Sequence, residues 1–112
     1  MTSKTYQPLL IFPLKAQVNL EQYRFVSANG DYCAAGKKSV GVVDVSTDKG
    51  QCCPIAALGL LLVTAGGAIT AGSGVTSDAN GKAVTATSSD EINGYALDSV
   101  SAGEEVRILR GI

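Results

Sequence analysis

The sequence predicts a mainly β protein, folded as a small barrel or sandwich of short antiparallel strands. Two dipeptides, Asn29-Gly30 and Asn80-Gly81, are strong hairpin signals, because both central positions of a type I′ turn need positive φ. The chain around them is rich in Val, Thr, Ile and Tyr, which suit a pleated sheet surface. No apolar helical period is sustained along the chain. We therefore expect short strands joined by tight turns.

The first 17 residues differ from the rest of the chain. They contain two of the three prolines and no glycine. Because proline restricts φ and pushes the preceding residue toward extended geometry, residues 1–17 are predicted to form an extended N-terminal arm beside a single β domain over 18–112. We expect the arm to pack as an edge strand on its own body or against a partner, since its apolar side chains are costly to leave in water. These side chains are Leu9, Leu10, Ile11, Phe12 and Leu14.

Within the domain, glycines and apolar residues recur at a nearly constant spacing. The matching pairs, at offsets of 51 or 53 residues, are Val18 and Ile69, Ala28 and Ala79, Gly41 and Gly94, Gly50 and Gly103, and Ile55 and Ile108. We therefore predict two similar halves, 18–59 and 69–112, which fold on each other because neither could bury its apolar face alone. Coincidence in a chain rich in small residues is the alternative.

Three segments are the main candidates for regular structure after the arm. Residues 41–45 and 106–109 are predicted to be short strands. The apolar segment 53–63 is compatible with a helix or with a buried strand, because an apolar run without a clear period does not separate the two.

Charge and amino-acid content exclude several function classes. The chain carries 9 Lys+Arg and 10 Asp+Glu, whereas nucleic-acid-binding domains usually have a basic excess. It has no His, which removes the commonest general base and the commonest metal ligand. Its N-terminal apolar run, 9–12, is too short for the core of a signal peptide, and its longest apolar run, 55–63, is about half the length of a membrane-spanning helix. We expect no nucleic acid and no membrane among the partners.

No catalytic, cofactor-binding or metal-binding pattern is found in the sequence. Glu104 and Glu105 would point to opposite faces of a strand, which makes them a poor acid–base pair. The glycines at 72 and 74 lack the third glycine of a dinucleotide-binding loop. The loop that begins at Asp78 lacks the glutamate of a calcium loop. We therefore expect no enzymatic activity, no cofactor and no metal.

The three cysteines indicate a reduced, intracellular setting. They cannot all pair internally, and the adjacent Cys52 and Cys53 are poorly placed to bridge each other. A buried free cysteine behaves as a small apolar side chain. The alternative is a thiol redox protein that uses Cys52 and Cys53.

Between the halves lies a run of small, uncharged residues. Such a segment permits close backbone approach, either in a tight turn or at a subunit contact. The candidates for a contact are Ala65, Gly66, Gly67, Ala68 and Ile69.

Several of these elements together resemble a known family. They are AGGAITAG at 65–72, VTSD at 75–78, NGKAV at 80–84, GYAL at 94–97, Ala102-Gly103 with 106–109, and GVVDVSTDKGQCCPIAALG at 41–59. In these elements the chain resembles the capsid cement, or head decoration, proteins of tailed bacteriophages. The resemblance covers roughly residues 40–112, and the first 40 residues match poorly.

The resemblance implies a structural role in the virion. Proteins of this family are small and β-rich, and they bind the outside of an expanded icosahedral shell, usually as trimers and sometimes as dimers. The implied partners are the major capsid protein and further copies of this chain, on the outer capsid surface after synthesis in the host cytoplasm. The resemblance implies no catalytic residues. Contact through the arm is our own hypothesis, because the arm departs from the family pattern. The alternatives are a free-standing β domain that binds a small ligand and the thiol redox protein.

Overall fold

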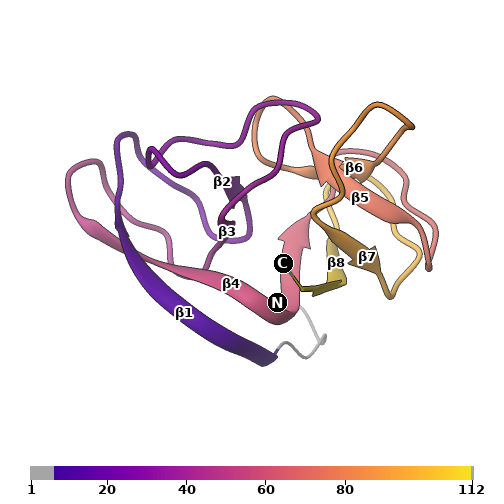
Figure 1. Ribbon diagram of the computed structural model, residues 1–112, viewed down its shortest axis with the longest axis horizontal. Helices are drawn as coiled ribbons and strands as arrows, with labels where there is room; N and C mark the ends of the chain where they lie inside the picture. The colour runs from indigo at the N-terminus through magenta and orange to yellow at the C-terminus, as the bar shows by residue number, and fades with distance from the viewer. Residues whose placement is uncertain (1–6, 112) are drawn as a thin grey trace.

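The computed structural model describes residues 7–111. Every regular secondary-structure element in that range is a β-strand. They are β1 (Gln7–Lys15), β2 (Phe25–Val26), β3 (Gly41–Val43), β4 (Cys52–Thr64), β5 (Gly74–Ser77), β6 (Ala83–Thr85), β7 (Gly94–Ala96) and β8 (Glu105–Arg110). Seven strands follow the order β2-β3-β4-β8-β7-β5-β6 and curl into a nearly closed antiparallel barrel, while β1 pairs with β4 (Figure 1). The prediction of a mainly β, antiparallel fold is confirmed.

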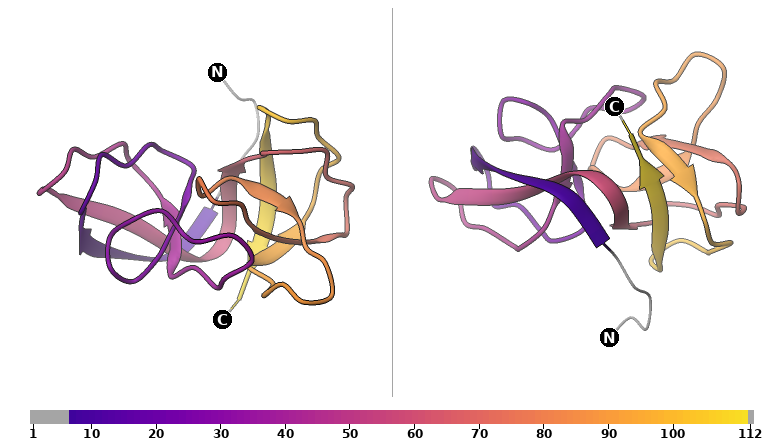
Figure 2. Two further views of the ribbon diagram at one scale, coloured as in Figure 1. Left: turned by 90° about the horizontal axis from the view of Figure 1, so that it is seen from above. Right: turned by 60° about the horizontal axis from the view of Figure 1, so that its bottom comes forward.

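The longest strand, β4, organises the sheet. Its first part pairs with β1 along one edge and with β3 along the other, and its second part pairs with β8. Because β4 is strongly curved, β1 to β3 lie toward one end of the molecule and β5 to β8 toward the other (Figures 1 and 2). The segment 53–63, which the sequence left open between helix and strand, is a strand throughout.

Gly59 lies where β1 and β8 both reach β4. It pairs with Pro8 on one edge and with Arg110 on the other. Its φ is 111°, and an added Cβ would lie 2.7 Å from the carbonyl oxygen of Gln7. Glycine is therefore required at this crowded junction, both for its backbone conformation and for its lack of a side chain.

Both Asn-Gly hairpins form, but their turns are not of the predicted type I′. Only the glycine of each pair has positive φ, 88° at Gly30 and 78° at Gly81. The amide of Gly81 donates to the carbonyl oxygen of Asp78 at 3.2 Å, so the Asn-Gly pair fills the last two positions of a four-residue turn. The Asp78 carboxylate also accepts the amide of Asn80 at 2.8 Å, which favours this turn over type I′.

Two apolar clusters fill the fold. The N-terminal core consists of Ala16, Leu20, Val26, Val43, Cys53 and Ile55, with Phe12, Leu14, Val18, Tyr32 and Val40 packed against it. The C-terminal core consists of Phe25, Cys33, Val42, Ala56, Leu61, Val63, Ala65, Ile69, Val75, Ala83, Ala96, Val106 and Ile108, with Val100 packed against it. Four members of the C-terminal core precede residue 60 (Phe25, Cys33, Val42 and Ala56), so the two parts of the chain share this core.

The strand register repeats along the chain. The pairs Lys15–Cys52, Leu14–Cys53 and Phe12–Ile55 between β1 and β4 are matched by Thr64–Glu105, Val63–Val106 and Leu61–Ile108 between β4 and β8. The pair Val42–Ala56 between β3 and β4 is likewise matched by Tyr95–Leu109 between β7 and β8. The second part of β4 therefore pairs with β8 in the same register in which β1 pairs with the first part of β4.

A buried arginine ties the last strand to distant loops. The Arg110 guanidinium donates to the carbonyl oxygens of Ala57 at 2.8 Å, of Asn93 at 3.0 Å and of Ser39. Burial lowers the pKa of Arg110, because the charged form is removed from water. The carbonyl acceptors compensate for part of the lost hydration and hold β8 against the segments that precede β3 and β7.

Candidate contact surface on strand β1

Strand β1 exposes most of its apolar side chains. The exposed fractions are 80% for Leu9, 48% for Leu10 and 45% for Ile11. Phe12 and Leu14 are half-buried and pack against the N-terminal core. Successive side chains of a strand point to opposite faces, but two register shifts around Leu10 interrupt the alternation, and Leu9 and Leu10 are both left outside.

A shallow apolar groove continues this surface onto β4. It encloses about 270 Å³ and is lined by Ile11, Phe12, Pro13, Cys52, Cys53 and Pro54. Pro13 lies opposite Pro54 in the register, so the two strands line the groove side by side. We call Leu9, Leu10, Ile11 and the side chains of this groove the β1 surface.

The backbone of β1 adds an unpaired edge to the β1 surface. Among the described residues β1 pairs with β4 alone. The Pro54 carbonyl accepts the amide of Asp44 at 3.0 Å, so the backbone groups of Pro54 point away from β1. Because Pro13 lies opposite Pro54, its own backbone faces the open edge, where proline offers a carbonyl acceptor but no N–H donor. The open edge can accept a further strand, and Pro13 restricts the registers in which that strand can pair.

Comparison with protein families decides what kind of protein carries this surface. A family model described as "Phage cement protein" matches residues 5–112. The chain belongs to the phage cement protein family. This is a structural, non-enzymatic family, so the expectation that the chain is not an enzyme is confirmed, and the protein is a capsid-associated component of a phage virion.

A solved structure shares the fold of this cement protein. It is the crystal structure of the head fiber gp8.5 N base of bacteriophage phi29, with a TM-score of 0.77 and 24% sequence identity. The match covers 91% of the present chain and 93% of the other. No curated protein matches the chain.

Two of the three cysteines of the cement protein are buried. Cys52 is exposed on the β1 surface, whereas Cys33 and Cys53 are buried in different cores. Burial raises the pKa of the Cys33 and Cys53 thiols, because the thiolate is poorly solvated there. A raised pKa reduces the thiolate fraction on which thiol redox chemistry depends. Nothing in this geometry supports a reactive Cys52–Cys53 pair.

The contact candidates at 65–69 divide between interior and surface. Ala65 and Ile69 are buried in the C-terminal core, where Ala65 bridges to Ala83 and Ile69 to Val100. Gly66 and Ala68 are exposed, and Gly67 is half-buried. A partner contact at 66–68 stays a prediction.

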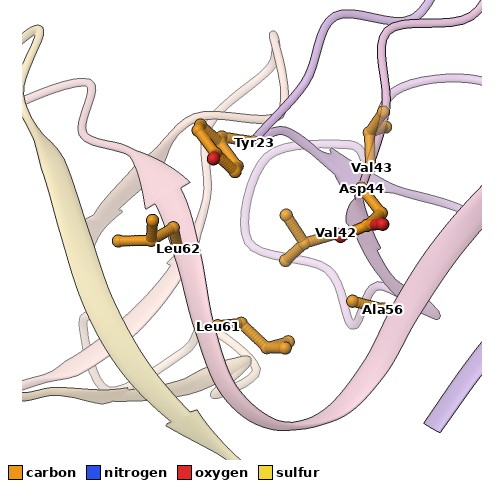
Figure 3. Close-up of a pocket in the computed structure, with 7 residues that line it drawn as sticks. All are labelled: Tyr23, Val42, Val43, Asp44, Ala56, Leu61 and Leu62. Atoms are coloured by element: carbon orange, nitrogen blue, oxygen red, sulfur yellow. The ribbon is translucent and has the colours of Figure 1, made fainter. Parts of the chain in front are cut away.

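The space between β3 and the second part of β4 is packed rather than hollow. Figure 3 shows Leu61 and Leu62 on one arm of the curved β4, across from Val42 and Ala56. Tyr23, Val43 and Asp44 complete the lining, and no volume is left for a water molecule. This site therefore offers no chamber for a small ligand.

Over residues 7–111 there is no group of three potential metal-ligating side chains of the His, Cys, Asp or Glu type, and no helix long and apolar enough to cross a membrane.

A second exposed apolar surface was not predicted from the sequence. It consists of Tyr95, Leu97 and Leu109, and we call it the β7–β8 face. One signal could have revealed it. Along β8, Val106, Ile108 and Arg110 point inward, so Leu109 is an apolar residue on the outward side of the strand.

Proposed function

We propose that this cement protein binds the outer surface of an expanded icosahedral phage shell and stabilises the shell by bridging capsid subunits. The observation that carries the proposal is an edge strand, β1, whose apolar side chains are exposed although the strand belongs to the chain's own sheet. The major capsid protein is the proposed partner at the β1 surface. Self-association, with a homotrimer favoured and a dimer as the alternative, is part of the same proposal, with no role for nucleic acid or membrane.

The physical chemistry of β1 suits a repeating lattice. Strand addition at its open edge supplies main-chain hydrogen bonds, and Leu9, Leu10 and Ile11 can fill pockets in the partner. At about 25 cal/mol per Å² of apolar area, burial of these side chains contributes several kcal/mol before ordering costs. An oligomer that engages several lattice sites gains avidity, so each contact can be modest.

We further propose that the domain is built from two similar halves. The support is the repeated register, in which β1 with β4 matches β4 with β8 and β3 with β4 matches β7 with β8. A formal charge of only −1 suits dense packing of many copies on a shell, because they repel one another little. The position on the outer capsid after synthesis in the host cytoplasm is proposed with the shell contact.

Co-sedimentation with undecorated, expanded shells tests the shell contact. Deletion of residues 1–17 would test the contact poorly, because it also removes Phe12 and Leu14, which pack on the N-terminal core. The sharper variant is Leu9→Glu combined with Leu10→Glu, which charges the outward side of β1. The matched control is Val45→Glu, an exposed apolar residue that follows β3, across β4 from β1.

We expect saturable binding at a fixed ratio to capsid subunits for the wild type and the control. The double variant should lose at least about tenfold in affinity, because each copy would bring a charged strand to an apolar pocket. If the wild type stays in the supernatant with its cognate shell, the proposed function is wrong. If the double variant binds like the control, the contact lies elsewhere than on β1.

A further inference from the structure

The β7–β8 face is an apolar patch that the other described residues, within 7–111, leave exposed. Tyr95 and Leu109 lie directly opposite each other in the register of the two strands, and Leu97 follows β7. Their exposed fractions are 56%, 51% and 39%. A shallow hollow of about 180 Å³ beside them is lined by Lys38, Ile92, Gly94, Tyr95, Leu109 and Gly111.

The charged groups at the border of this face already have partners within the chain. The Arg107 guanidinium donates to the Asp98 carboxylate at 2.8 Å, and the Lys38 ammonium donates to the carbonyl oxygen of Ile92 at 2.7 Å. An apolar centre with a satisfied polar rim is the usual composition of a protein interface. A partner could therefore cover the face without leaving these charges unpaired.

The chain itself shows what covers a face of this kind. By register, Tyr95 and Leu109 occupy the places that Val42 and Ala56 occupy between β3 and β4. Val42 and Ala56 are buried in the C-terminal core, where Leu61 from the second part of β4 points toward them (Figure 3). The cover in that case is another strand of the same fold. Among residues 7–111, no segment covers the equivalent place over the β7–β8 face, where Tyr95 and Leu109 are exposed.

We propose that a second copy of this chain covers the β7–β8 face. The inference rests on the proposed function, of which it specifies the self-association surface. It also separates two roles on the molecule, with β1 directed to the shell and β7–β8 directed to a further copy. Tyr95 and Leu109 form the centre of the contact, and the Arg107–Asp98 pair lies at its rim.

The test measures assembly of the full chain in the absence of shells, by light scattering after size-exclusion chromatography over a range of concentrations. The variants are Tyr95→Glu and Leu109→Glu. Val45→Glu is the matched control, since Val45 and Leu109 are both 51% exposed. We expect an oligomer for the wild type and the control. Each variant should raise the dissociation constant of the assembly about 30-fold or more, as for a charge placed at the centre of an interface.

Thermal unfolding of each variant shows whether it is folded like the control. A second measurement does not depend on variants. Amide hydrogen exchange of the wild type at 94–97 and 105–110 should be slower above the assembly concentration than below it. A wild type that stays monomeric at all concentrations, folded variants that assemble like the wild type, or exchange that is independent of concentration would each overturn the inference.

Shell binding distinguishes failure of this inference from failure of the proposed function. The Leu9→Glu/Leu10→Glu variant should still assemble in solution while it loses the shell. The Leu109→Glu variant should still bind shells as single copies, with the weaker apparent affinity that follows from lost avidity. If Leu109→Glu assembles normally but shells still bind the wild type through β1, only the present inference fails.

Discussion

Strand β1 and the second part of β4, residues 59–64, have the same pairing but opposite environments. Each runs antiparallel to a later segment of the chain, with Phe12 opposite Ile55 in one case and Leu61 opposite Ile108 in the other. Phe12 is only half-buried, whereas Leu61 is 1% exposed.

The difference lies in what packs over the outer side of each strand. Leu62 is buried, and Tyr23 from the N-terminal part of the chain lines the packed space beside it. Pro13, at the matching position of β1, has no such cover and is exposed. Strand pairing therefore sets which way a side chain points, and tertiary packing sets whether it is buried. Of the two matching strands, the second part of β4 is buried in the core, whereas β1 remains accessible at the surface.

The largest expected effect compares Leu61 with Phe12. Leu61→Ala should lower the free energy of unfolding by about 3 kcal/mol, because it leaves a cavity in the C-terminal core. Phe12→Ala, at the matching position of β1, should lower it by only about 1 kcal/mol, because Phe12 is already half in water. Urea unfolding of both variants measures the difference. Equal losses would mean that Phe12 is as deeply packed as Leu61, which would contradict the difference in burial between the two strands.

A smaller effect is expected at the junction of the two strands. Gly59→Ala should cost about 2 kcal/mol or more, since its φ is 111° and the new Cβ would press on the backbone of β1. Gly103→Ala is the control, with φ of 90° and nothing within 4 Å of the added Cβ, and it should cost about 1 kcal/mol. Thermal unfolding of the two variants separates crowding from backbone strain. A Gly103 variant as unstable as the Gly59 variant would show that β1 does not press on the junction.

The smallest expected effect concerns a thiol in the N-terminal core. Cys53 occupies the place that Val106 takes in the C-terminal core, and burial raises its pKa above the usual value of 9.0. The unfolded chain then loses this proton first, so the stability contributed by the neutral thiol is complete below about pH 9 and declines as pH rises toward the folded-state pKa.

Cys53→Val removes that contribution. Urea unfolding with reductant at pH 8, 9 and 10 should show a smaller loss of stability above about pH 9 in the variant than in the wild type. The remaining loss is assigned in part to Cys33 and Tyr23, whose pKa values burial also raises. Identical pH dependence in the two proteins would show that the Cys53 thiol is not desolvated as described.

Much of the fold followed from local chemistry. The Asn-Gly dipeptides located two hairpins. The strands predicted at 41–45 and 106–109 are found at 41–43 and 105–110. The turn type was missed because Asp78 bonds to the backbone of its own turn, a competition that the Asn-Gly pattern does not reveal. The apolar content of the N-terminal segment gave five contact candidates, and only the packing of β1 separated exposed Leu9, Leu10 and Ile11 from half-buried Phe12 and Leu14.

The sequence by itself determined the mainly β class, the hairpin positions and the resemblance to phage cement proteins, because turns and alternation depend on neighbouring residues. The tertiary structure alone decided that residues 53–63 form a strand, that Ala65 and Ile69 lie inside, and that Tyr95 and Leu109 lie outside. Burial of these residues depends on segments tens of positions away, such as Val100 over Ile69 or Leu61 near Val42. No local pattern encodes those contacts, so the division of the apolar residues between core and surface was settled only in the folded chain.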